Sequence, residues 1–271
     1  MNGWELTLIA HPEIELDASA MSAMETCKNE KEACGISLRS SRTGYELLVG
    51  DLFKVRYRAD DRIVMTGDVK FMHQLGFAWS RRTLLIEGDV GLGLGTQMQG
   101  GSIQVLGQAM DFSGCQMRGG VIRISGDAGN FLGGPLPGRR SGMSGGRVVV
   151  TGNVGHHPGH CMRRGTIVML GDCGDGMATD MVAGTIVAAG QVGEFVGAGM
   201  RRGTVVLATA SEVNPVRFTS PRDVDLCISR ILANDLVSDA PEIAKILNGP
   251  VRRWLGDRSV GGLGEILAPL W

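Results

Sequence analysis

The residues best suited to chemistry in this 271-residue sequence gather between positions 156 and 175. Six side chains of zinc-ligand type occur there at close spacing: His156, His157, His160, Cys161, Cys173 and Asp175. His156 and His157 are adjacent, so on a strand they would face opposite sides, and the glycines and the proline around them indicate a turn. A turn with surface histidines is therefore favoured, and we expect no metal site.

Other cysteines and one glycine run offer weaker chemistry. Cys27, Cys34, Cys115 and Cys227 could act as nucleophiles only if the fold brought a base to them, and a buried apolar thiol is the alternative. Residues 91–95 (GLGLG) superficially resemble a phosphate-binding loop. No helix is expected after them, so the helix N-terminus that such a loop uses is absent.

A 19-residue repeat must position all of these residues. Glycines 88, 107 and 126 step by 19, as do glycines 152, 171 and 190, and the intervening step is longer by seven residues. Each of these glycines closes a short run of alternating apolar residues, such as 120–126 (GVIRISG). A methionine column keeps the same register: Met98, Met117, Met143, Met162, Met181 and Met200. A fixed period of this length indicates a solenoid.

The length of the repeat predicts a right-handed parallel β-helix. Nineteen residues leave no room for a ten-residue helix, alternation predicts strands with one inward face, and glycine suits tight corners. We expect about eight coils over 59–210, with the methionines inside and residues 134–140 (GPLPGRR) as a loop. Residues 1–58 are expected to form a small N-terminal cap, with strands near 5–9 and 44–49 and a helix around 20–33. Residues 211–271 are expected to form a helical segment and tail, with one helix opening after Pro221 and another over 240–247.

An apolar stripe is expected on the outside of the later coils. With Ile167 and Met169 inward, the outward strand positions in four successive coils are valines: Val149, Val168, Val187 and Val206. A bare stripe of this kind is unusual on a soluble protein. We expect the chain's own C-terminal segment to cover it through Val224, Ile228 and Ile231, and a neighbouring subunit is the alternative.

Arginines gather at the expected corners and on the inserted loop: Arg118, Arg139, Arg140, Arg163, Arg164, Arg201 and Arg202. Two interpretations stay open. Solvated charge at corners keeps coils from aggregating, whereas a functional surface would dock an anionic group. Arg163 and Arg201 lie two coils apart, and Val182 between them interrupts the row.

Composition excludes several classes of function. The formal net charge is −1, so no global basic field favours nucleic acid or an anionic membrane. No apolar run is long enough for a membrane-spanning helix, and the first ten residues do not resemble a signal peptide. The six cysteines include no CxxC pair, which favours reduced thiols and a cytoplasmic protein.

The repeat resembles a known family. It is similar to the GxGxG β-helix that the C-terminal domain of glutamate synthase large subunits shares with one subunit of formylmethanofuran dehydrogenase. Residues 50–53 (GDLF) and 140–146 (RSGMSGG) resemble elements of that dehydrogenase subunit family. The family has a bacterial branch, the formyltransferase/hydrolase complex of methylotrophs. The strong arginine bias favours this branch, since lysine occurs at only five positions and arginine supplies the other 22 basic residues.

The resemblance implies a non-catalytic scaffold subunit in one-carbon metabolism. The complex would move a formyl group from tetrahydromethanopterin to a methanofuran-type carrier and hydrolyse it to formate during formaldehyde oxidation. The implied partners are a hydrolase, a formyltransferase and a further subunit, and no catalytic residue maps onto this chain. The corresponding subunit of a methanogen-type formylmethanofuran dehydrogenase and a stand-alone glutamate-synthase-like module stay open. A polysaccharide lyase is disfavoured because the outward strand positions are poor in carboxylates.

Overall fold

The computed structural model describes residues 3–40, 42–209 and 213–270. Within these residues the chain is mostly β, with one 13-stranded sheet, a 4-stranded sheet and a few short helices. The boundary expected at 210/211 lies outside the described residues. No helix in the described part is both long and apolar enough to cross a membrane.

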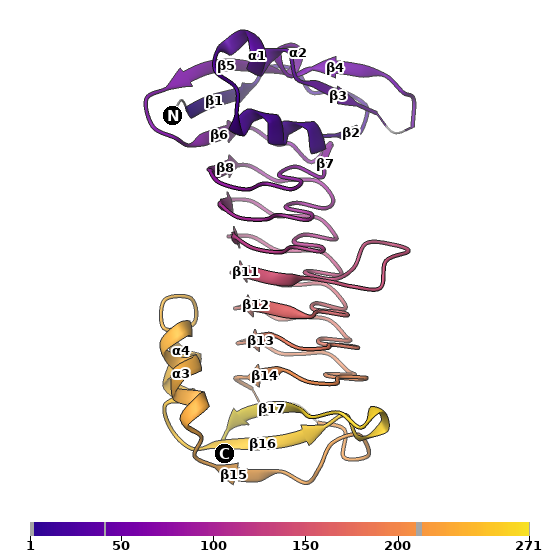
Figure 1. The fold of residues 1–271 in the computed structure, drawn as a ribbon, viewed down its shortest axis with the longest axis vertical. Helices are drawn as coiled ribbons and strands as arrows, with labels where there is room; N and C mark the ends of the chain where they lie inside the picture. The colour runs from indigo at the N-terminus through magenta and orange to yellow at the C-terminus, as the bar shows by residue number, and fades with distance from the viewer. Residues whose placement is uncertain (1–2, 41, 210–212, 271) are drawn as a thin grey trace.

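The centre of the large sheet is a stack of parallel strands in sequence order. Figure 1 shows one strand per coil, each coil returning to lie beside the last. The strands are β6 (Ile63–Thr66), β8 (Thr83–Glu87), β9 (Ser102–Val105), β10 (Val121–Ile124), β11 (Ser144–Val150), β12 (Arg164–Met169), β13 (Thr185–Ala188) and β14 (Thr204–Leu207). Equivalent residues of neighbouring repeats pair directly, as Ile167 does with Ile186. A second ladder of single bridges runs through Val69, Val90, Ala109, Ala128, Val154, Cys173 and Val192.

The interior of the stack is apolar, as the repeat predicts. All six column methionines have no exposed side-chain surface, so their predicted burial is confirmed. Gly159 shows why a corner needs glycine. Its φ is +70°, and a Cβ there would lie 2.1 Å from Cδ1 of Ile186. Any other residue would meet both backbone strain and a side chain of the core.

The N-terminal segment closes one end of the stack. β1 (Gly3–Leu8) pairs parallel with β6 and antiparallel with β5 (Phe53–Arg58), so it extends the large sheet. The remaining elements lie over the same end: β2 (Leu16–Asp17), β3 (Ser37–Arg39), β4 (Glu46–Leu48), β7 (Met72–His73) and α2 (Val49–Leu52).

The single helix expected around 20–33 is wrong. The structure has a 3-10 helix, η1 (Ser19–Glu25), and a separate helix, α1 (Glu30–Cys34). Asn29 caps α1 by accepting a hydrogen bond from the Glu32 backbone, and the Glu32 carboxylate accepts one from the Lys28 backbone. This capping pair starts a new helix at 30 and therefore prevents a continuous one.

The C-terminal segment contains strands that the sequence did not indicate. β17 (Gly264–Pro269) pairs parallel with β14, and β16 (Val251–Gly256) continues the sheet to β15 (Arg222–Val224). A short η2 (Arg258–Val260) lies between β16 and β17. The helix expected after Pro221 is therefore wrong at its start, because Val224 pairs with Val251 in the sheet. The helix α3 runs over Cys227–Leu236 and α4 over Pro241–Leu247.

The valine stripe is covered by the chain itself, as predicted. Its four valines form one cluster with residues of α3, α4 and the strands that follow. Of the three expected contact residues, Val224 packs against this cluster, but the two isoleucines do not. Ile228 and Ile231 are 56% and 64% exposed, whereas Ala233 and Leu236 are buried. The buried residues Ser229, Ala233 and Leu236 follow one another at i, i+4 and i+7, so they form the inward face of α3 and the two isoleucines lie off that face.

Candidate functional site

The seven arginines singled out in the sequence all lie on the surface. Arg118, Arg163 and Arg201 follow the methionine column, and each backbone N–H donates to a methionine carbonyl of the previous coil. They therefore share one edge of the stack, with Val182 in the same register between the last two. Arg139 and Arg140 lie on the inserted loop between β10 and β11. None of the seven forms an ion pair within the described ranges, so their charges face solvent.

Two other arginines have structural roles that the sequence did not reveal. Arg123 and Arg147 both reach Asp239, at 2.8 Å and 2.5 Å, and the Asp239 side chain is almost fully buried. Burial alone would raise the pKa of Asp239, but the hydrogen bonds and charges of the two arginines outweigh it and hold the pKa below its usual value. This group fastens the α3–α4 connection to β10 and β11.

The six zinc-type residues singled out in the sequence do not form one cluster. Nδ1 of His156 lies 3.6 Å from the Asp175 carboxylate at the surface. The His157 ring stacks on Phe131, with centroids 5.2 Å apart. Cys173 points into the core, 3.9 Å from the sulfur of Met177, and burial is the main cause that raises the pKa of its thiol to about 11.

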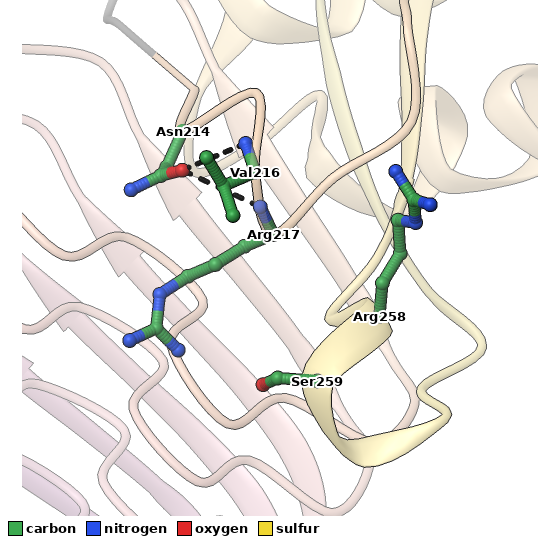
Figure 2. Close-up of a pocket in the computed structure, with 5 residues that line it drawn as sticks. All are labelled: Asn214, Val216, Arg217, Arg258 and Ser259. Atoms are coloured by element: carbon green, nitrogen blue, oxygen red, sulfur yellow. Dashed lines mark hydrogen bonds between the residues drawn. The ribbon is translucent and has the colours of Figure 1, made fainter.

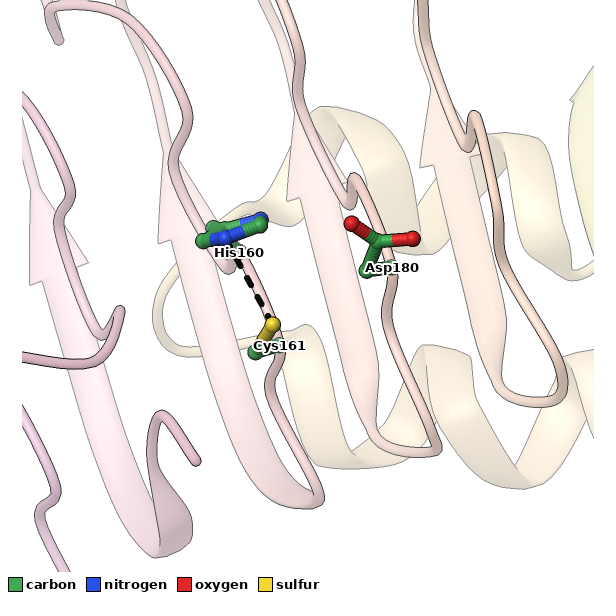
Figure 3. A group of neighbouring side chains, drawn as sticks. All are labelled: His160, Cys161 and Asp180. Atoms are coloured by element: carbon green, nitrogen blue, oxygen red, sulfur yellow. Dashed lines mark hydrogen bonds between the residues drawn. The ribbon is translucent and has the colours of Figure 1, made fainter. Parts of the chain in front are cut away.

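The structure instead brings His160 and Cys161 together with Asp180 (Figure 3). One ligand-type atom from each side chain lies within 4.8 Å of the others. Burial first, and then the charge of Asp180, raises the pKa of the Cys161 thiol, while Arg163 acts in the opposite direction. Asp180 was missed in the sequence, although it stands one repeat of 19 residues after Cys161.

A surface cavity lies beside the last coil (Figure 2). Its volume is about 810 Å³, and it is lined by Asn214, Val216, Arg217, Arg258 and Ser259. The side chain of Asn214 accepts hydrogen bonds from the backbone N–H groups of Val216 and Arg217. Arg217 is bound to the buried carboxylate of Asp257 at 2.8 Å. Arg258 has no ion pair in the described part of the chain, so this hollow offers a cationic group but no acid–base pair.

A smaller groove of about 280 Å³ separates the N-terminal segment from the inserted loop. Its walls include His73, Phe112, Leu136 and Pro137. His73 accepts a hydrogen bond from the Leu92 backbone on Nδ1, so its proton is on Nε2. Phe112 begins a stack of rings that continues through the inner coils to His157. Of these rings only Phe112 lines the groove, and nothing in the sequence indicated that the N-terminal segment and the inserted loop would meet there.

No protein-family model matches the chain, and no curated protein matches it either. A chain from the X-ray crystal structure of the formyltransferase/hydrolase complex (FhcABCD) of Methylorubrum extorquens, solved with methylofuran, is similar. The identity is 34%, the TM-score is 0.89, and the match covers 98% of this chain and 100% of that one. A shared fold over both full lengths at this identity shows common descent. This chain therefore belongs to the family of that component of the formyltransferase/hydrolase complex.

Proposed function

We propose that this chain is the GxGxG β-helix subunit of a formyltransferase/hydrolase complex and acts there as a non-catalytic scaffold. The observation that carries the proposal is the match to a chain of such a complex along both full lengths. We further propose a right-handed parallel β-helix over 59–210, an N-terminal cap over 1–58 and a C-terminal segment from 211. The complex would work in the cytoplasm, where it moves a formyl group from tetrahydromethanopterin to a methanofuran-type carrier and hydrolyses it to formate.

The distribution of ionisable groups supports a scaffold. Among the described residues, the buried carboxylates with lowered pKa values, Asp239 and Asp257, are held in ion pairs that fasten the C-terminal segment. Cys161 has a histidine beside it, but its raised pKa keeps it a thiol rather than a nucleophilic thiolate. Formyl transfer and hydrolysis would accordingly take place on the other chains.

The arginine edge is proposed as a docking surface for an anionic group. Arg163, Arg164, Arg201 and Arg202 are exposed and have no carboxylate partners in the part of the chain described. An acidic surface of another subunit would bind there, or the glutamate-rich tail that the family resemblance implies for the carrier. Arginine forks suit carboxylates because they can donate two parallel hydrogen bonds.

Affinity purification of the tagged chain from its native host tests the assignment. We expect hydrolase and formyltransferase subunits to co-purify, and the isolated chain to show no formyl transfer or hydrolysis. Turnover by the pure chain near the rate of the complex would overturn the scaffold role. Recovery of redox subunits in place of the hydrolase would favour the dehydrogenase alternative.

The docking surface needs a separate experiment. The double variant Arg163→Ala/Arg201→Ala should purify as a folded chain. We expect either that it assembles with the other subunits only at a lower salt concentration than wild type, or that it assembles normally but the complex loses carrier. Loss of assembly would identify an acidic surface on another subunit, and loss of carrier would identify the glutamate-rich tail. Wild-type assembly with full carrier content at raised salt would show that these arginines are only solvated.

A further inference from the structure

We propose that His160, Cys161 and Asp180 form a three-ligand binding site for a Zn²⁺-class metal ion at the outer corner of two adjacent coils (Figure 3). This site does not depend on the proposed scaffold role. Sequence patterns did not favour a metal here, because the third ligand lies one coil away from the other two.

The distance between the two strongest ligands fits a zinc ion. Sγ of Cys161 lies 3.5 Å from Nε2 of His160. In a tetrahedral zinc site, Zn–S of about 2.3 Å and Zn–N of about 2.0 Å place these atoms roughly 3.5 Å apart. The carboxylate of Asp180 lies with both of them in a group spanning at most 4.8 Å. For all three to bind one ion, the exposed Asp180 side chain would turn its oxygen toward the other two ligands.

The imidazole of His160 is oriented for binding. Its Nδ1 lies 3.1 Å from the carbonyl oxygen of Thr179. A carbonyl only accepts, so Nδ1 carries the proton and Nε2 presents its lone pair toward Cys161. A backbone carbonyl that fixes the ring in this way is the usual outer support of a metal-binding histidine.

The corner that holds these ligands is rigid. Cys161 and Asp180 occupy the same position in successive coils, with φ values of +53° and +54°. The backbone N–H of Cys161 donates to Thr179, and that of Asp180 donates to Ala198. Gly199, one coil further, leaves open the space that one Asp180 oxygen occupies. The stack therefore holds the backbones of Cys161 and Asp180 in place before any ion binds, and only the Asp180 side chain has to be ordered by the ion.

The charge of the group also favours a cation. Asp180 forms no ion pair among the described residues, and it lies beside Cys161, which would bind a zinc-class ion as a thiolate. A divalent cation neutralises both groups. The mixture of nitrogen, sulfur and oxygen ligands suits Zn²⁺ or Co²⁺ rather than Mg²⁺ or Ca²⁺, which prefer oxygen alone. Asp180 is exposed, so water can reach the open fourth position.

Cobalt titration of the full-length chain tests the site. The purified protein is reduced, stripped of metal with a chelator and titrated with Co²⁺. We expect one equivalent to give the d–d bands of four-coordinate cobalt and a thiolate charge-transfer band, both abolished by Zn²⁺. Cys161→Ser should remove the charge-transfer band, and Asp180→Asn should weaken Co²⁺ binding at least tenfold.

Matched variants separate this site from adventitious binding. Cys227→Ser removes an exposed thiol elsewhere, and His156→Ala removes the exposed histidine of the same turn; both should retain the wild-type spectrum and affinity. Circular dichroism confirms that each variant is folded. The proposal is overturned if wild type gives no charge-transfer band, if Cys161→Ser keeps it, or if either control variant loses it.

Discussion

The buried carboxylate of Asp257 joins the C-terminal strands to the last coil. The carboxylate accepts hydrogen bonds from the Arg217 side chain and from the backbone N–H groups of Gly199 and Ser259. The backbone N–H of Asp257 donates to the carbonyl of Met200. Burial opposes ionisation, but these hydrogen bonds together lower the pKa of Asp257 to about 2. The charged form therefore stabilises the folded chain.

Replacing Asp257 with asparagine should lower the free energy of unfolding at neutral pH by about 2 kcal/mol, the equivalent of its pKa shift. The folded pKa lies below the unfolded value of 3.8, so this stabilisation is complete above pH 3.8 and disappears as the pH falls to about 2. Urea unfolding at a series of pH values measures it. Asp223→Asn, in an exposed ion pair with Arg252, is the control and should cost much less.

The methionine column offers a second test on single residues. Met162 has no exposed surface, and its terminal methyl lies against Gly184 of the next coil. Met162→Ala should lower the free energy of unfolding by roughly 2–5 kcal/mol, because it leaves a cavity in the core. Met110→Ala, at a 44% exposed position, should change it by no more than about 0.5 kcal/mol. Equal costs in urea unfolding would contradict the inward register of the column.

Among the elements, α3 and α4 matter most to the outer wall of the later coils. Ile243 on α4 is fully buried in the cluster that covers the valine stripe, whereas Ile231 on α3 is 64% exposed. Ile243→Ala should therefore cost roughly 2–5 kcal/mol of unfolding free energy, and Ile231→Ala about 0.5 kcal/mol or less. Thermal or urea unfolding of the two variants compares them directly. A larger loss from Ile231→Ala would show that the helix packs through its other face.

At the scale of the whole molecule, the exposed isoleucines of α3 are candidates for a contact with another subunit of the proposed complex. Ile228 and Ile231 form an apolar pair that no described residue covers, on the helix that already packs on the stack. Buried apolar residues in the centre of an interface often dominate its binding energy. We expect Ile228→Ser/Ile231→Ser to leave the fold intact and to weaken assembly with the other subunits by tenfold or more.

Size-exclusion chromatography of the co-expressed subunits measures that assembly, and circular dichroism reports the fold. Val216→Ser, at a more exposed apolar residue away from α3, is the matched control. Assembly of the double variant at the wild-type level would place the contacts with other subunits on another face.

The sequence alone determined the features that follow from its 19-residue repeat. The 19-residue spacing fixed the strand register, because equivalent residues of adjacent coils pair one to one, and it placed the methionines inside. The same period identified the row of outward valines, and it predicted that the chain's own C-terminal segment covers them, as the structure shows. Periodicity carries this information because each coil repeats the same environment.

Only the tertiary structure decided which residues far apart in the sequence come into contact. Arg123 meets Asp239 across 116 positions, and no local pattern signals such a pair. Residues 222–224 form a strand despite the helix signal of Pro221, because they pair with residues 251–253. The sequence around Pro221 could not show that pairing, since the partner strand lies far along the chain. Asp180 joins His160 and Cys161 only when the coils stack, since 19 residues of chain then return to the same corner.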